Sequence, residues 1–288
     1  MISLFQVLKY SAPVAFGAVG ESAVQRSGII NVGLEGLMLS AAFAATVASD
    51  KTGNPWIGLA AGVAVGVAVA LFLGILTIRY ALDQIVVGTA INLLALGVCG
   101  TLFEKQGATG KLLNLPAIPP LFGKFDVILL LLIVASAGLG YVLYRTPFGL
   151  KLRAVGEYPP AAEAAGFSPA KIRYQALVIG GLFGGLGGAY LVLGVAQSFA
   201  TEMVAGRGFI AIALVTFARW RPFGILLSAM LLGFFEALQF SLQLDGSNIP
   251  RSLLLALPYV ATLVILVFVG KGTRAPQSLG TALDGTDS

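Results

Sequence analysis

Long, uninterrupted apolar stretches constrain this chain more than any other feature of its sequence. A helix needs about 20 apolar residues to cross a bilayer. Seven stretches approach or exceed this length: Ile2 to Gly20, Ile29 to Ser49, Trp56 to Ile78, Gln84 to Phe103, Val127 to Tyr144, Tyr174 to Phe199 and Pro222 to Leu244; an eighth runs from Ser252 to Gly270. Because lipid offers the backbone no hydrogen-bond partners, and because the runs do not alternate, they predict membrane-spanning helices. The predicted fold is all-α, a polytopic transmembrane bundle of about eight to ten spans over residues 1–271, with a polar tail at 272–288 expected to be disordered.

The composition excludes a water-soluble fold and several kinds of site. Hydrophobic residues make up 57% of the chain and charged residues 11%, against roughly 45–50% and ~25% in an ordinary globular domain. There is no histidine, and Cys99 is the sole cysteine, so a disulfide within the chain, a Cys/His zinc site and a His-based catalytic triad are excluded. With these ligands missing, we expect no bound metal. The net charge of +5 fits lysines and arginines gathered in cytoplasmic loops, so we expect no nucleic-acid partner.

Basic residues also predict the orientation in the membrane. The loop from Arg145 to Arg173 holds five of them, which places it in the cytoplasm. Further along, Gly208 to Ala218 is apolar but only 11 residues long, which indicates a half-membrane helix or a re-entrant segment. If this segment counts as a crossing, the N-terminus and Arg207 lie outside, whereas Arg219, Arg221 and the C-terminus lie inside. If it does not cross, the last two spans invert.

The basic loop contains the most informative polar stretch. Pro159-Pro160 can open a helix, Ala161 to Ala165 are strong helix formers, and Gly166 is suited to end it, so we predict a helix of one or two turns. Such a helix is either an interfacial loop without a role or a peg that docks into a groove on a soluble partner. The sequence Gly270-Lys271-Gly272-Thr273 lacks the remaining features of a phosphate-binding loop, so we expect no ATP site on this chain.

Four motifs, in order along the chain, resemble one family. Arg153 to Glu157, followed by Ala161 to Gly166, is similar to the coupling loop in membrane permeases of bacterial ABC importers, in the class that serves ribose-type sugars, branched-chain amino acids and nucleosides. The other three motifs are Ser27 to Gly36, Asp83 to Gly97 and Gly206 to Pro222. The Asp83 to Gly97 block most resembles the nucleoside branch. Ala218 departs from the pattern, because a glycine is expected there.

The resemblance implies a permease that forms half of a pore in the bacterial inner membrane. Its implied partners are a cytoplasmic ATP-binding subunit, an extracytoplasmic substrate-binding protein and a second permease, with a heterodimer favoured over a homodimer. ATP and Mg would bind the partner ATPase, so this chain is expected to hold no cofactor and no catalytic residue. The loop helix would carry the motion of the ATPase to the spans as rigid-body gating. The residues implied to couple to the ATPase are Arg153, Gly156, Glu157, Ala161, Glu163 and Gly166.

Polar side chains inside apolar stretches are the candidates for a substrate pathway, because such residues are costly in lipid and face an interior or a watery cavity. The candidates are Asn31, Glu35, Gln84, Asn92, Glu236 and Gln239, with Gln243 beyond them and Phe234, Phe235 and Phe240 as aromatic neighbours. Amides and aromatic rings would suit the hydroxyls and flat base of a nucleoside. The alternative is that each polar group only bonds a neighbouring helix or caps a helix end.

Two other classes of function are alternatives to the permease. An intramembrane enzyme would need a second catalytic group beside Glu35 or Glu236, and no histidine is available. An ion-coupled secondary transporter would use paired intramembrane carboxylates in broken helices, but it gives the coupling motif no role. A ribose-type sugar or a branched-chain amino acid stays open as the substrate.

Glycines recur at every fourth position in two of the stretches. The first series is Gly58, Gly62, Gly66 and Gly74, and the second is Gly180, Gly184 and Gly188. Small residues at this spacing form a flat helix face on which a neighbouring backbone can approach closely. We therefore predict that these faces pack against other helices.

Overall fold

The structure is a computed structural model that describes residues 3–105, 115–123, 125–244, 250, 253–261 and 274–281. The main helices are α1 (Leu4–Arg26), α2 (Leu34–Thr52), α3 (Pro55–Gly74), α4 (Gln84–Lys105), α5 (Val127–Arg145), α6 (Pro147–Glu157), α7 (Pro159–Ala164), α8 (Pro169–Tyr190), α9 (Arg207–Phe217) and α10 (Pro222–Leu244), and residues 253–261 are also helical. Single π-helical segments, η1 (Ile75–Arg79) and η2 (Leu191–Ala196), extend α3 and α8. A short antiparallel pair, β1 (Pro120–Phe122) and β2 (Phe125–Asp126), precedes α5. The all-α prediction is confirmed.

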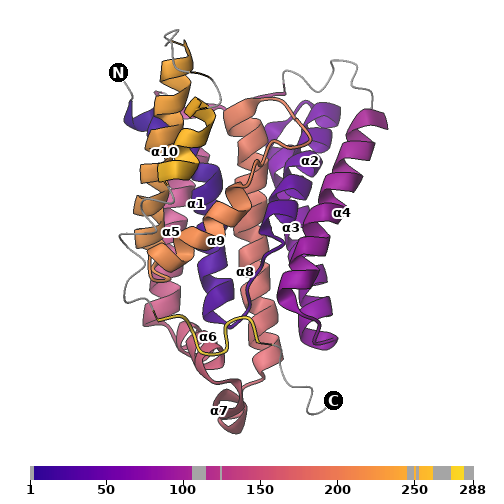
Figure 1. The fold of residues 1–288 in the computed structure, drawn as a ribbon, viewed down its shortest axis with the longest axis vertical. Coiled ribbons are helices and arrows are strands. Elements are labelled where there is room, and N and C mark those ends of the chain that lie inside the picture. Colours follow the sequence, from indigo (N-terminus) through magenta and orange to yellow (C-terminus); the bar gives the residue numbers. More distant parts are fainter. Residues whose placement is uncertain are drawn as a thin grey trace.

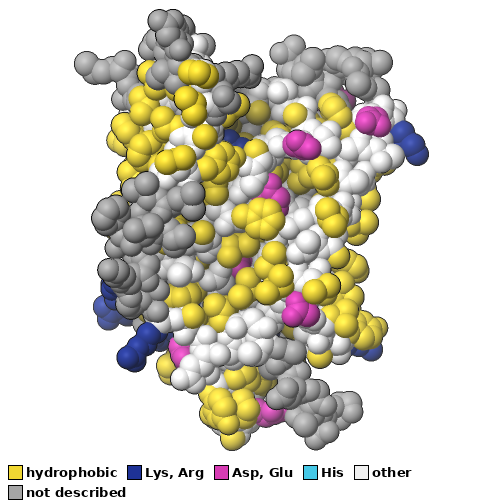
Figure 2. Space-filling view, in the orientation of Figure 1, with side chains coloured by type: hydrophobic (Ala, Val, Ile, Leu, Met, Phe, Trp, Pro, Cys, Tyr) yellow, Lys and Arg dark blue, Asp and Glu magenta, His cyan; other side chains and the backbone are white. Residues whose placement is uncertain are grey.

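The long helices lie side by side as a bundle, and α6 and α7 project from one end (Figure 1). Five helices of the described part are long and apolar enough to cross a membrane: Pro55–Arg79, Gln84–Lys105, Val127–Arg145, Pro169–Ala196 and Pro222–Gln243. On the face seen in Figure 2, hydrophobic side chains are spread along the height of the molecule, whereas most of the visible basic side chains lie toward its ends. Of the eighth predicted stretch, residues 253–261 are helical, whereas 252 and 262–270 lie outside the described residues.

The first two predicted spans differ from the observed helices. Helix α1 continues past Gly20 to Arg26, and α2 begins at Leu34 instead of Ile29. Nearly all of α1 from Leu8 to Gln25 is buried, because α5, α8, α9 and α10 pack around it. An interior helix of this kind touches protein instead of lipid, so it can carry polar residues that a lipid-facing span could not.

The chain between α8 and α10 crosses the bundle as an irregular segment followed by the short helix α9. We call the end of the bundle that carries α6 and α7 the coupling end. The residues that follow α9 are bonded to this end. There the Tyr144 hydroxyl donates to the Trp220 carbonyl at 2.9 Å, and Arg26 Nη2 donates to the Arg219 carbonyl at 3.5 Å. Arg219 thus lies at the coupling end, which favours the crossing alternative over the one in which the last two spans invert.

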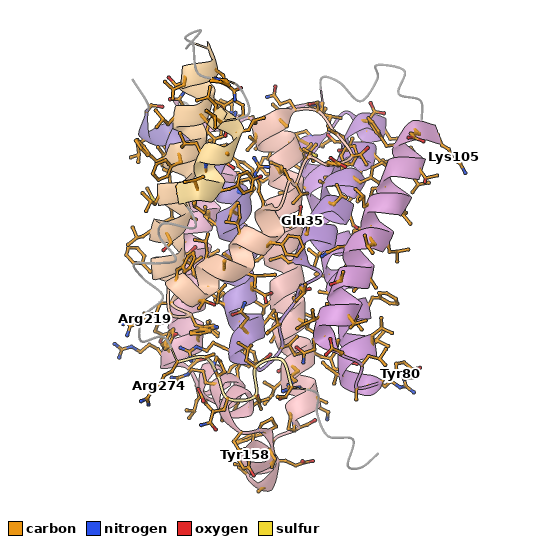
Figure 3. All side chains as sticks on the ribbon, in the orientation of Figure 1. Glu35, Tyr80, Lys105, Tyr158, Arg219 and Arg274 are labelled. Carbon is orange, nitrogen blue, oxygen red and sulfur yellow. The ribbon has the colours of Figure 1, made fainter. Side chains whose placement is uncertain are left out.

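The distribution of charged residues follows the predicted threading, with one correction. Figure 3 places Tyr80, next to Arg79, and Arg274 toward the coupling end with Tyr158, and Lys105 at the opposite end. Arg207 was expected in an outer loop. Instead it begins α9 and forms an ion pair with Glu236, with only 18% of its side chain exposed.

The glycine faces pack as predicted. A Cβ atom on Gly66 of α3 would lie 2.6 Å from the Gly181 carbonyl oxygen of α8, and one on Gly62 would lie 2.8 Å from the Ala41 carbonyl oxygen of α2. On the other side of α8, a Cβ on Gly184 would lie 2.7 Å from Leu37. The absence of side chains thus lets α8 pack closely against both α2 and α3.

Part of the tail differs from the predicted disorder. Residues 274–281 are described, and they form a turn over 277–280 that packs on the coupling end. The Ser278 side chain there is only 7% exposed, and its backbone N–H donates to the Gly156 carbonyl at 3.0 Å. Hydrogen bonds to the body of the protein hold this segment, which its composition alone did not reveal.

Candidate functional site

The coupling end is built from two consecutive helices that start and stop on clear local signals. Thr146 caps α6, where its hydroxyl accepts from the Gly149 N–H at 3.3 Å, and Pro147 occupies the first turn. Helix α7 opens at Pro159, and Gly166, with φ +84°, ends it in the left-handed conformation. The predicted short helix is confirmed as α7, which projects beyond the bundle (Figure 1). Helix α6 was not predicted.

The six residues implied to couple to the ATPase divide into two groups. Glu157, Ala161, Glu163 and Gly166 are exposed, so a partner could reach them. Gly156 is buried, and a Cβ on it would collide with the Arg26 carbonyl oxygen. The half-buried guanidinium of Arg153 lies over the Tyr144 ring at 5.2 Å, and its Nε donates to the Gly149 carbonyl at 3.3 Å. Gly156 and Arg153 therefore join the coupling helices to the bundle.

Two exposed apolar residues at this end were missed by the sequence reasoning. Tyr158, between α6 and α7 (Figure 3), is 59% exposed, and Leu150 of α6 is 62% exposed. Aromatic side chains are enriched among residues that dominate the energy of protein interfaces. Tyr158 stands directly before the Pro159-Pro160 helix start, so its place beside the predicted peg was a usable signal.

A second candidate region lies away from both ends of the bundle, where α2 and α9 both begin. The two carboxylate oxygens of Glu35, in the first turn of α2, accept from the backbone N–H groups of Gly206 and Gly208, each at 2.7 Å. Backbone N–H groups at the N-terminus of a helix such as α9 have no acceptor within the helix, and the helix dipole also favours a negative charge there. Figure 3 shows Glu35 near the middle of the long axis. Glu35 therefore holds the start of the short helix.

An ion pair lies next to this cap. Arg207 Nη2 and Glu236 Oε1 are 3.1 Å apart, joining α9 to α10. The second carboxylate oxygen of Glu236 and the Nε of Arg207 are buried and have no hydrogen-bond partner among the described residues. The Tyr259 hydroxyl donates to the Ala205 carbonyl at 2.6 Å, and the rings of Tyr10 and Phe240 stack at 4.9 Å. Within the described part of the chain, this region thus combines buried polar atoms that lack hydrogen-bond partners with aromatic rings.

Three predicted pathway residues are engaged with the link between α1 and α2, residues 27–33. Asn92 accepts from the Gly36 N–H at 2.7 Å and donates to the Val32 carbonyl at 2.9 Å. Gln84 accepts from the Ile30 N–H at 2.8 Å. These bonds agree with the alternative that polar side chains in apolar stretches only bond neighbouring segments, since Asn92 and Gln84 both tie the irregular α1–α2 link to α4. Asn31 is buried, and its Nδ2 has no partner among the described residues.

The remaining pathway candidates lie on α10. Gln239 is buried, at 8% exposure, whereas Gln243 is partly exposed. Of the aromatic neighbours, Phe234 and Phe235 contact each other edge to face, with ring centroids 5.7 Å apart. Their roles in a substrate pathway stay predictions.

Glu21 is a buried carboxylate that the sequence reasoning overlooked. It is 1% exposed, and its Oε1 accepts from the Asn31 N–H at 3.1 Å and from Gln25 Nε2 at 3.3 Å. Gln25 in turn accepts from the Trp220 indole N–H at 2.9 Å. This chain of bonds joins α1, the α1–α2 link and the end of α9. A carboxylate and an amide four residues apart in α1 were the available signal.

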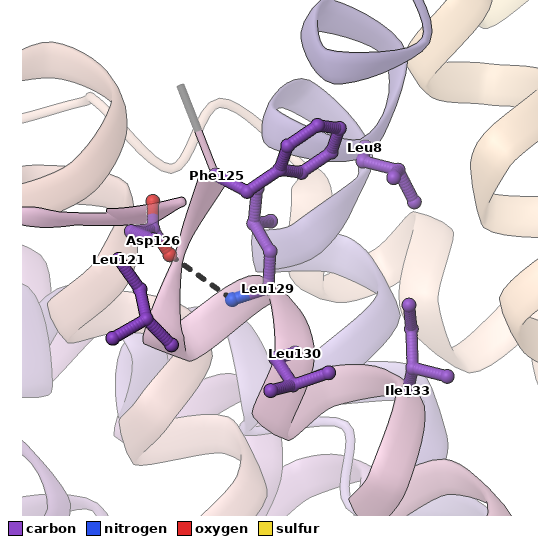
Figure 4. A pocket seen from close by; sticks show the side chains of 7 residues that line it. All are labelled: Leu8, Leu121, Phe125, Asp126, Leu129, Leu130 and Ile133. Carbon is purple, nitrogen blue, oxygen red and sulfur yellow. Dashed lines mark hydrogen bonds between the residues drawn. The ribbon is translucent and has the colours of Figure 1, made fainter. Parts of the chain in front are cut away.

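A pocket elsewhere in the structure does not suit a polar substrate. It is a cavity of about 320 Å³ lined by Leu8, Leu121, Phe125, Asp126, Leu129, Leu130 and Ile133 (Figure 4). Asp126 is its one charged residue, and this carboxylate accepts from the Leu129 N–H at 3.0 Å and from the Tyr190 hydroxyl at 2.7 Å. Asp126 thus caps α5 and joins it to α8. Across the described residues, no three His, Cys, Asp or Glu side chains come together as a metal site would require.

Comparison with known proteins decides the family. A family model described as branched-chain amino acid transport system / permease component matches residues 3–269. The chain belongs to this permease family. The permease is 35% identical to the guanosine ABC transporter permease protein NupQ of Bacillus subtilis (strain 168), covering 95% of this chain and 93% of the relative. It is also 35% identical to the nucleoside ABC transporter permease protein NupC of Lactococcus lactis subsp. cremoris (strain MG1363), covering 97% and 95%.

A solved structure supports the same architecture. An ABC transporter in an inward-facing conformation shares the fold of this permease with a TM-score of 0.57 and 16% identity, covering 92% of this chain and 85% of that one. The permease is therefore a multi-pass membrane component of an ABC transporter, as the sequence motifs indicated. Membership in this family decides against the intramembrane enzyme and the ion-coupled secondary transporter.

Proposed function

We propose that this permease moves nucleosides into the cell across the bacterial inner membrane, using ATP hydrolysed by a separate cytoplasmic subunit. The observation that carries the proposal is its 35% identity to a guanosine permease and to a nucleoside permease over nearly the full length of all three chains. The region around Arg207 and Glu236 is consistent with such a substrate, because it combines unused polar atoms with aromatic rings. Ribose-type sugars and branched-chain amino acids are the alternative substrates.

The proposed complex places the coupling end in the cytoplasm. Helix α7 then docks into a groove of the ATP-binding subunit, which binds ATP and Mg. Glu163 of α7 faces this subunit, together with Glu157 at the end of α6 and Tyr158 between the two helices. The C-terminal segment lies at the same end and is therefore cytoplasmic as well. A second permease, unlike this one, completes the pore, and an extracytoplasmic binding protein delivers the substrate to the opposite end.

The substrate is tested by uptake. Cells that carry this permease and its partner subunits are expected to accumulate labelled uridine, and deletion of the permease gene should abolish that uptake. Ribose and leucine serve as parallel tracers in the same cells. If the deletion abolishes uptake of ribose or leucine instead, that compound is the substrate and the nucleoside assignment is wrong. Unchanged uptake of all three tracers would contradict the transport role.

The coupling role is tested by a double change in the projecting helices. Glu157→Arg together with Gly166→Pro reverses an exposed charge and removes the left-handed residue that ends α7, since proline cannot adopt φ +84°. The variant is expected to reach the membrane but to uncouple ATP hydrolysis from transport. Uptake and ATPase activity are measured on the same vesicles.

The matched control is Asp50→Arg, a charge reversal at an exposed position near the end of α2. This control should retain transport and coupling. If the double variant also transports at the wild-type rate, α6 and α7 are not the coupling element.

A further inference from the structure

The described part of the tail forms a compact turn that we call the C-terminal clasp, residues 276–281. Within it, the Leu279 N–H donates to the Pro276 carbonyl and the Thr281 N–H to the Ser278 carbonyl, each at 3.1 Å. Gly280 has φ +80°, a conformation that favours glycine. In Figure 1 this segment, drawn in yellow, passes across the bundle beside α6. The clasp is therefore a defined piece of structure in direct reach of the coupling helices.

On one side the clasp caps α6. The last carbonyl groups of a helix have no partner within it, and Ser278 supplies donors to two of them. Its N–H donates to the Gly156 carbonyl at 3.0 Å, and its hydroxyl lies 2.7 Å from that oxygen and 3.2 Å from the Val155 carbonyl. The C-terminal end of α6 is thus held by a residue far away in the sequence.

On its other side the clasp holds the bundle. The Gly280 N–H donates to the Gly28 carbonyl in the α1–α2 link at 3.0 Å. The Thr281 carbonyl accepts from Arg173 Nη1 of α8 and from Gln84 Nε2 of α4, each at 3.2 Å. The clasp therefore bonds α6, the link, α8 and α4 at one place.

The contacts continue from the link to the middle of the bundle. Gln84 also accepts from Ile30 in the link, which leads directly into the first turn of α2. Glu35 in that turn holds the start of α9 through Gly206 and Gly208. A displacement of α6 that pulled on the clasp would thus act on the segments that position the starts of α2 and α9.

We propose that the C-terminal clasp is a positioning element of the transport cycle, which transmits movement of the coupling helices to the α1–α2 link and α4. This inference rests on the proposed function, in which α6 and α7 contact an ATP-binding subunit. In this proposal Ser278 binds the clasp to α6 through its hydrogen bonds, and Gln84 and Arg173 bind the clasp to the bundle.

The test compares two truncations and one point variant in the complete transporter, reconstituted with its partner subunits in lipid vesicles. Deletion of residues 274–288 removes the clasp, whereas deletion of 282–288 keeps it. Ser278→Ala removes the hydroxyl contact alone, and Ser198→Ala is its control, because that hydroxyl donates to the Ala196 carbonyl two residues earlier. The measured quantity is the amount of substrate transported per ATP hydrolysed, using whichever of uridine, ribose or leucine the wild type carries.

Deletion of 274–288 is expected to lower this ratio roughly fivefold or more, the scale of a typical coupling between two sites. Ser278→Ala should lower it less, and both controls should keep it. A purely structural role would reduce transport and ATP hydrolysis together and leave the ratio unchanged, which would overturn the proposal. If the long deletion does not fold, an unchanged ratio in Ser278→Ala overturns it.

The coupling-helix variant Glu157→Arg with Gly166→Pro is measured in the same series. If that variant keeps the wild-type ratio, the proposed coupling role itself fails. If it uncouples while the clasp variants do not, only the clasp proposal fails.

Discussion

Replacing Glu35 with alanine is expected to abolish transport and to destabilise the permease. The change leaves the N–H groups of Gly206 and Gly208 without their acceptor at a partly buried place in the bundle. A buried donor without a partner costs about 1–3 kcal/mol, and two partly buried donors are affected here. We expect the midpoint of thermal denaturation of the purified permease to fall by roughly 5 °C or more, and substrate uptake to be lost.

Two further variants make this expectation specific. Glu35→Gln keeps one acceptor oxygen, so it should be less destabilising than Glu35→Ala. Glu202→Ala removes an exposed carboxylate from the irregular segment just before α9 and should change neither measurement. Wild-type stability and uptake in Glu35→Ala would mean that α9 does not depend on this cap.

Replacing Gly66 with valine is expected to prevent the helices from assembling. Already the first added atom would lie 2.6 Å from the Gly181 carbonyl oxygen and 2.7 Å from the Gly185 Cα, which are backbone atoms that cannot turn aside. Overpacking a core costs about 1–3 kcal/mol and occasionally more, and here two helix axes must separate. The expected result is little or no folded permease in the membrane fraction, measured by quantitative blotting and by gel filtration in detergent.

Gly97→Val is the matched control. Gly97 lies in α4, and a Cβ atom there would have no neighbour within 4 Å. This variant should accumulate like the wild type. Equal amounts of folded protein from Gly66→Val would show that α3 and α8 can separate without loss of the fold.

Features that depend on lipid contact or on local backbone signals could be predicted from the sequence. The apolar stretches located the spans because hydropathy reports on contact with lipid. The proline pair and Gly166 located α7 through local backbone preferences, since proline fixes φ at the helix start and glycine readily adopts the positive φ that ends the helix. The start of α6 carried similar information, a threonine cap followed by Pro147, which could have been used.

Features that depend on contacts between distant segments could not be predicted in the same way. Glu21 looked like the end of a span, but α1 is an interior helix that continues past it. Glu35 and Asn92 were recognised as unusual polar residues in apolar surroundings, yet their partners are backbone groups of other segments. Ser278 lies in a polar tail, and only its bonds to Gly156 distinguish it from a disordered residue.

The burial of α1 also affects how the chain is built into the membrane. The insertion machinery selects segments by their hydropathy. Helix α1 carries Glu21, Gln25 and Arg26 in its final turns, and it is not among the five helices of the described part that are long and apolar enough to cross a membrane. The helices that shield it, α8 and α10, are synthesised much later. Stable placement of α1 therefore requires the C-terminal half of the chain, so an interrupted translation product would leave its first helix without its protein environment.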